Sequence, residues 1–265
     1  MKTAIAFKGN GLASLRIFVY ALALACALFD AWMPAVAATN RSIQMPRSAP
    51  RQAIAVNAES ESTLSESKAT WHGESHAALT ERWWQWLESI PYGVGPNGDP
   101  SGANCGVNQE GPVWFLAAPV GGTFSSACTI PAGKIILSAV FAVIDDYPCP
   151  PPQVGPPFGP PPGQSLDAFL KADITQFVDA VAYATATLDN EALHVRRVKT
   201  SLFPFTAAAS NLQGDSCITG SPQLGVSDGY FVFIEPLPPG QHVLRLQSAA
   251  TGGPVTDVTT TLTVQ

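Results

Sequence analysis

The chain has 265 residues and a formal net charge of −6, from 14 lysine and arginine residues against 20 aspartate and glutamate residues. The basic residues are scattered, and Arg196-Arg197 is the only adjacent pair. The sequence therefore lacks the basic surface that attracts nucleic acids or anionic membranes. We expect no nucleic-acid partner.

The N-terminus has the order of features found in secretory signal peptides. Basic residues precede an apolar run over residues 17–29, and small residues follow at 35–38. The run has about 13 residues, fewer than the roughly 20 that a helix needs to cross a bilayer. We expect residues 1–37 to be a cleaved signal peptide, so that the protein is secreted or periplasmic and its mature chain has no transmembrane segment.

The cysteines predict a disulfide framework. Cys26 would leave with the signal peptide, and four cysteines in an oxidising compartment predict two disulfides. Three pairings are open, and we favour Cys105 with Cys128 because these two bracket one predicted hairpin. The second disulfide would then join Cys149 to Cys217, which lie in two long loops.

The mature chain divides into a linker and one domain. Residues 38–70 are rich in Ser, Ala, Glu and Arg and show no hydrophobic period, which indicates a disordered linker. Residues 71–265 have a length that fits a single domain, since β-sandwiches of this size commonly fold as one unit.

Two amphipathic helices and a proline-rich loop interrupt the domain. Ser75 can cap a helix that ends before Pro91, because large apolar residues recur between them at steps of three and four. A second helix with the same period opens after Ser165. Residues 148–162 hold nine prolines, which cannot pair into a sheet and predict an extended loop.

The remaining elements are predicted to be strands, because short apolar runs alternate with Gly and Pro. These runs are 113–117, 123–124, 128–130, 135–144, 230–234, 242–246 and 258–264. Residues 182–198 predict a hairpin around Asp189-Asn190, and the β-branched run 135–144 predicts a central strand covered on both faces. The predicted fold is mainly β, a β-sandwich or jelly-roll-like domain with two inserted amphipathic helices and two disulfides.

Six short motifs follow one another along the domain. They are ERWWQW at 81–86, DPSGANC at 99–105, GPVWFLA at 111–117, CTIPAGK at 128–134, SDGY at 227–230 and PLPPGQH at 236–242. Together they resemble a group of uncharacterised exported bacterial proteins, and the resemblance covers nearly all of residues 71–265. It implies export and a single domain. It implies no catalytic residue, because no activity is established for that group.

One loop has the spacing of a calcium site. Asn97, Asp99 and Ser101 place oxygen side chains at alternate positions before Gly102. The twelfth position is Asn108 instead of a bidentate Glu, so an ordinary Asn/Asp/Gly turn is the favoured interpretation. We expect no cofactor, with weak calcium binding by this loop as the one exception.

Two acidic residues close the longest predicted strand. Asp145 and Asp146 could supply a general acid beside an ionised base if one pKa were raised. Adjacent residues on a strand point to opposite faces, however, so we expect a solvated strand end there.

Aromatic residues gather in the N-terminal half of the domain, and flat rings offer large, rigid contact area to a ligand. Trp83 and Trp86 lie on the apolar stripe of the first helix, which predicts burial. Trp84 lies off the centre of that stripe. We therefore expect Trp84 and Tyr92 to be the exposed, ligand-binding residues.

Three functional hypotheses follow. The spacing shows no nucleophile–base pair, which favours a non-catalytic binding or cell-envelope domain for a glycan, a polymer or a protein. The alternative is a secreted hydrolase whose site is assembled from distant residues. Its available groups are Asp99, Asp145, His194, Asp228 and His242. A purely structural domain is the third hypothesis, and burial of Trp84 would favour it.

Overall fold

The computed structural model describes residues 70–150 and 157–265. The predicted signal peptide, and all of the predicted linker except Thr70, lie outside the described residues. The described part is mainly β, with two five-stranded sheets, a two-stranded sheet, two α-helices and two disulfides. The predicted fold class is therefore confirmed.

Two long antiparallel strands form the centre of the first sheet, which we call the β5–β10 sheet. Its strands are β3 (Val113–Leu116), β5 (Ile135–Tyr147), β10 (Gln223–Ile234), β8 (Arg196–Lys199) and β9 (Phe203–Phe205). The order is β3-β5-β10-β8, with β9 also pairing with β10. β3 is parallel to β5, and the other pairs are antiparallel.

The second five-stranded sheet, the β11–β12 sheet, has the order β4-β12-β11-β6-β7. Its strands are β4 (Gly122–Ile130), β12 (Val255–Val264), β11 (Gly240–Ala250), β6 (Val181–Leu188) and β7 (Glu191–Ala192). β4 joins two runs that the sequence predicted as separate strands. It pairs parallel to β12 through residues 122–130.

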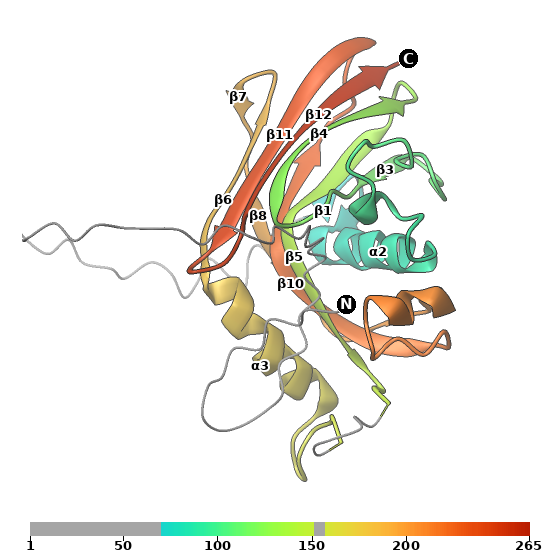
Figure 1. Ribbon diagram of the computed structural model, residues 1–265, viewed down its shortest axis with the longest axis vertical. Helices are drawn as coiled ribbons and strands as arrows, with labels where there is room; N and C mark the ends of the chain where they lie inside the picture. The colour runs from blue at the N-terminus through green and yellow to red at the C-terminus, as the bar shows by residue number, and fades with distance from the viewer. Residues whose placement is uncertain (1–69, 151–156) are drawn as a thin grey trace, which may run out of the picture.

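The β5–β10 sheet is the middle layer of the molecule (Figure 1). Helix α2 (His76–Ser89) covers one face, and the other face is shared between the β11–β12 sheet and helix α3 (Leu166–Asp179). Along β5, Leu137 therefore packs under α2, Ile136 packs against the second sheet and Val143 packs against α3. Burial on both faces explains the nearly continuous apolar run of this strand.

Both predicted helices begin at the predicted caps. Ser75 Oγ accepts a hydrogen bond from the Ala78 N–H at 3.1 Å, and Ser165 Oγ accepts one from the Ala168 N–H at 3.2 Å. Within the described ranges no helix is long and apolar enough to cross a membrane. The short elements are β1 (Thr70–Trp71), β2 (Glu74–Ser75) and the 3₁₀ turns η1 (Pro96–Gly98) and η2 (Ala209–Gln213).

The predicted hairpin over 182–198 is only partly correct. β6 and β7 do pair around Asp189 and Asn190, whose φ angles of 51° and 71° suit a tight hairpin turn. After Ala192 the chain leaves this sheet, and β8 pairs with β10 in the other one. The crossing buries Val198 in the core under α2, which a longer hairpin would leave outside it.

Both favoured disulfide pairings are confirmed. Cys105–Cys128 joins the loop before β3 to β4, and Cys149–Cys217 joins the end of β5 to the segment before β10. Each bond closes a loop between segments that are far apart in sequence, which restricts the unfolded chain. The proline-rich loop predicted over residues 148–162 contains Cys149, and its residues 151–156 lie outside the described part.

Candidate functional site

The second half of β5 has one unpaired edge. β3 ends at Leu116, opposite Ser138, and from Ala139 onward no strand among the described residues pairs with β5 on that side. The prediction of a central strand therefore holds only for the first part of β5. An unpaired strand edge offers rows of N–H and C=O groups to another chain.

The orientation of the backbone along this edge follows from β10. The Ser227 N–H donates to Thr200 Oγ1 at 2.8 Å, and Ser227 O accepts from the Thr200 N–H at 2.9 Å, so both groups of Ser227 face away from β5. Ser227 is the register partner of Ile144. Antiparallel pairs alternate, so the N–H and C=O of Ile144, and those of Ala142 two residues earlier, point to the open edge.

A partly open pocket of about 80 Å³ lies along this edge. Its walls come from α2, the loop after β3, β5 itself and the facing strands β11 and β12. The lining residues that matter below are Trp84, Glu88, Ala118, Ala139, Ala142 and Leu246. Of the described residues that line the pocket, only Glu88 is charged. We call this feature the edge pocket.

Glu88 lies where α2 meets the edge pocket. Burial raises the pKa of its carboxyl to about 7, while a hydrogen bond from Asn211 opposes the rise and Asp215 adds to it. Asn211 Nδ2 donates to Glu88 Oε2 at 3.1 Å. No basic side chain in the described ranges forms an ion pair with Glu88. The pocket therefore contains an acidic group that lacks a cationic partner.

The two acidic residues that end β5 are not solvated, contrary to expectation. Asp146 is 3% exposed and its Oδ1 lies 3.4 Å from Gln223 Nε2. Asp145 Oδ1 accepts the Asp146 N–H at 3.0 Å, whereas its Oδ2 is buried without a hydrogen-bond partner among the described residues. Burial, and then the nearby Asp173 of α3, raise the pKa of Asp145 to about 8. The sequence could not show this, because Asp173 is distant in the chain.

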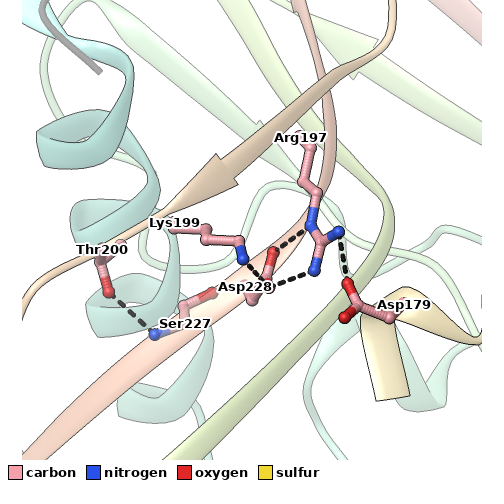
Figure 2. Close-up of polar contacts among 6 residues, drawn as sticks. All are labelled: Asp179, Arg197, Lys199, Thr200, Ser227 and Asp228. Carbon is pink, nitrogen blue, oxygen red and sulfur yellow. Dashed lines mark hydrogen bonds and ion pairs between the residues drawn. The ribbon is translucent and has the colours of Figure 1, made fainter. Parts of the chain in front are cut away.

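Asp228 of β10 is also buried, but it has strong partners (Figure 2). Arg197 Nε and Nη2 donate to its two carboxylate oxygens at 2.8 and 2.6 Å, and Lys199 Nζ lies 3.5 Å from Oδ2. Arg197 Nη1 also reaches Asp179 Oδ1, at the end of α3, at 2.7 Å. The hydrogen bond with Asp228 raises the pKa of Arg197. Arg197 of β8 therefore links Asp228 of β10 to Asp179 at the end of α3.

The expectation that Trp84 is exposed is wrong. Trp84 is 6% exposed, and its Nε1 donates to Ser227 Oγ at 2.6 Å. Trp83 and Trp86 also donate, to backbone carbonyl groups, so all three indoles of α2 find polar partners in the core. The protein core therefore covers a larger part of the α2 surface than its narrow apolar stripe predicts. Tyr92, by contrast, is 40% exposed.

The predicted calcium loop is held together by its own hydrogen bonds. Asp99 Oδ1 accepts from the N–H and Oγ of Ser101, and Oδ2 accepts from the Asn104 N–H at 2.8 Å. Desolvation is the largest single effect and raises the pKa of Asp99, but these hydrogen bonds together outweigh it, so the pKa is lowered. Asn97 lies in η1 and lines the edge pocket. The described residues contain no cluster of three metal-ligating side chains, and weak calcium binding stays a prediction.

The residues considered for a hydrolase lie in separate local networks. His242 Nδ1 lies 2.7 Å from Asp189 Oδ2, and its Nε2 lies 3.0 Å from Pro238 O. These contacts raise the pKa of His242 and engage both of its ring nitrogens. His194 is exposed between β7 and β8. The structure places neither histidine beside Asp228, which is engaged with Arg197 instead.

Comparisons of the chain with protein-family models, curated proteins and solved structures found no match. The resemblance drawn from the six motifs therefore stays an expectation. Sequence reasoning missed Glu88 and the open edge of β5. The sequence carries one usable signal for Glu88, an acidic residue at the end of a tryptophan-rich helix, but none for the length of β3.

Proposed function

We propose that the protein is an exported, non-catalytic binding domain that takes its ligand in the edge pocket. The observation that carries this proposal is the partly open, mostly apolar pocket of about 80 Å³ beside an unpaired strand edge. Ligand sites in proteins are typically concave and apolar with a few polar groups, which is the composition of this lining.

The pocket also argues against the purely structural hypothesis, although Trp84 is buried. Protein interiors are close-packed, and voids larger than a water molecule are few because each one costs stability. Ala118, Ala139 and Ala142 leave this space open between α2 and the two sheets. Larger side chains at these positions could fill it, so the small residues favour a binding role.

The contacts of His242 and Asp228 weigh against the hydrolase hypothesis. A general base needs a free lone pair within reach of its substrate. Both nitrogens of His242 have neighbours, and both oxygens of Asp228 accept from Arg197. These groups stabilise local structure in the positions that they occupy.

A filled-pocket variant tests the proposal. The full-length protein with its disulfides intact is screened by thermal shift against calcium, soluble glycans and synthetic peptides. A ligand of the edge pocket should raise the Tm of the wild type and of the control Ala192→Trp, on exposed β7, but not of Ala118→Trp. A Tm shift that persists in Ala118→Trp would place the ligand elsewhere. Turnover of ester or glycoside substrates that Ala118→Trp abolishes would favour the hydrolase.

A further inference from the structure

We infer that the ligand is an extended peptide that adds to β5 as a strand, inserts an apolar side chain into the edge pocket and places a lysine or arginine beside Glu88. This inference rests on the proposed function and names the class of partner. Three independent features of the edge pocket support it: the direction of its backbone groups, the shape of its cavity and its charge.

The backbone of β5 is oriented to pair with one more strand. Ala142 and Ile144 direct their N–H and C=O groups to the open edge, as the contacts of Ser227 with Thr200 show. β3 occupies the same edge as far as Ser138, and the loop that follows it, with Ala118 and Pro119, lines the edge pocket. Pro119 has no N–H to donate to β5. A peptide would continue the pairing where β3 stops. Peptide-binding domains use this kind of strand addition widely.

The cavity suits one side chain of such a peptide. Successive residues of an added strand point to opposite faces, so alternate side chains would enter the space beside β5. The walls offered there by Ala139, Ala142 and Leu246 are apolar, and about 80 Å³ accommodates a group of the size of an aliphatic side chain. A glycan fits less well, because its hydroxyl groups would lose water and meet few polar partners.

The charge of the site favours a basic residue in the peptide. Glu88 is the charged member of the described lining and has no cationic partner among the described residues. Its raised pKa reflects burial without such a partner. Asp145 and Asp146 follow Ile144 directly along the same strand. A lysine or arginine at this end would replace the missing counter-charge.

The experiment uses random octapeptides displayed on phage and panned against the full-length protein with its disulfides intact. The expected result is enrichment of peptides with alternate apolar residues and a Lys or Arg near one end. A synthetic peptide of the enriched sequence then gives a Kd for the wild type and for each variant. No enrichment, or enrichment without this pattern, overturns the inference.

A proline variant tests the backbone pairing. Ala142→Pro removes an N–H that faces the open edge and leaves the β10 ladder intact, so the Kd should rise at least tenfold. The matched control is Ser125→Pro on β4. On β4, the Ala127 N–H donates to Ser101 O and therefore points away from β12. The Ser125 N–H, two residues earlier on the same strand, also points away from β12. This control should bind like the wild type, and equal binding by Ala142→Pro would overturn the inference.

Two further measurements test the inference even if Ala142→Pro fails to fold. In the wild-type protein, the peptide should slow hydrogen exchange at the Ala142 and Ile144 amides. Glu88→Gln should weaken binding several-fold and reduce its dependence on salt. Unchanged exchange at both amides overturns strand addition.

The outcomes also separate this inference from the proposed function. If a glycan or another non-peptide ligand raises the Tm and Ala118→Trp abolishes the shift, the binding domain stands and the peptide inference fails. If Ala118→Trp abolishes the binding of no peptide and of no other ligand, both the proposed function and the peptide inference fail.

Discussion

Asp228 and Asp145 lie on the same face of the β5–β10 sheet, yet they are held in opposite ways. Asp145 pairs in register with Val226, two residues before Asp228, and both carboxyl groups face α3. Asp228 accepts a bidentate contact from Arg197, whereas Asp145 Oδ2 is buried and has no hydrogen-bond partner in the part of the chain that the structure describes. The same face of the sheet therefore carries one buried carboxylate that is paired with an arginine and one buried carboxyl group that is not.

The ion pair of Asp228 stabilises the fold, whereas the unpaired carboxyl oxygen of Asp145 lies next to a residue of the edge pocket. Arg197 connects β8, β10 and the end of α3, so removing it would loosen three elements (Figure 2). Asp145 follows Ile144, which lines the edge pocket. Asp228 therefore stabilises the fold through Arg197, whereas Asp145 is a buried carboxyl group near the candidate site, without an ion-pair partner among the described residues.

Arg197→Met should have the largest effect on stability. The variant keeps an apolar stem but leaves Asp228, which is 1% exposed, with Lys199 at 3.5 Å as its one cationic partner among the described residues. Removal of one partner from a buried ion pair costs about 3–5 kcal/mol, because the other charge stays buried. Urea unfolding of both proteins at neutral pH measures the loss.

The double variant Arg197→Met/Asp228→Asn provides the control for this prediction. It also removes the negative charge of Asp228, which Arg197→Met leaves buried without its arginine partner. The double variant should therefore recover part of the lost free energy of unfolding. If the double variant were no more stable than Arg197→Met, the cost would come from lost packing of the arginine stem instead.

Asp145→Asn should remove a pH dependence that the wild type shows. The pKa of Asp145 is about 8 in the folded protein against an ordinary value of 3.8, so the folded state binds this proton more tightly. Its contribution is therefore full below about pH 4 and is lost as the pH rises towards 8. The slope is at most about 1.4 kcal/mol per pH unit, which sums to a few kcal/mol.

Unfolding free energies of the wild type and Asp145→Asn from pH 4 to pH 9 test this assignment. The variant should gain on the wild type as the pH rises, and the difference should level off above pH 8. Asp173→Asn should shift the wild-type transition to lower pH, because Asp173 contributes to the raised pKa. If the difference in unfolding free energy between the two proteins stayed constant from pH 4 to pH 9, the raised pKa of Asp145 would be wrong.

Ser227→Ala tests the opposite face of β10 and should have a smaller effect. It leaves the buried Nε1 of Trp84 without its acceptor at 2.6 Å, which costs about 1–3 kcal/mol. Ser227→Thr keeps an acceptor and should lose less. Chemical denaturation, with tryptophan fluorescence as the probe, measures both. Equal stability of Ser227→Ala and the wild type would show that the indole finds another acceptor.

Much of the fold could be predicted because its signals are local. Ser75 and Ser165 are followed by helical periods, and residues 135–144 form a β-branched run that requires cover on both faces. In both cases the signal lies within a short stretch of sequence. The favoured disulfide pairing is also correct, but the hairpin expected between Cys105 and Cys128 does not form, because β3 and β4 belong to different sheets.

The candidate site could not be predicted because it depends on distant pairings. Nothing in residues 192–199 shows that β8 crosses to β10, where Arg197 meets Asp228. The open edge exists only because β3 is shorter than β5, and the length of a strand depends on its neighbours. The burial of Trp84 was missed for a related reason, because the hydroxyl group that accepts from its Nε1 belongs to Ser227 of β10, far away in the sequence.

Asp179→Asn should have the smallest effect, and it sharpens the contrast between the two ends of Arg197. The contact of Asp179 with Arg197 Nη1 is as short as those of Asp228, but Asp179 is 56% exposed. Exposed ion pairs typically contribute about 0–1 kcal/mol, because water solvates each charge when the pair is broken. The variant should lose at most this amount in urea unfolding, and added salt should reduce the difference. A loss as large as that of Arg197→Met would mean that Arg197 acts mainly by anchoring α3 instead of compensating Asp228.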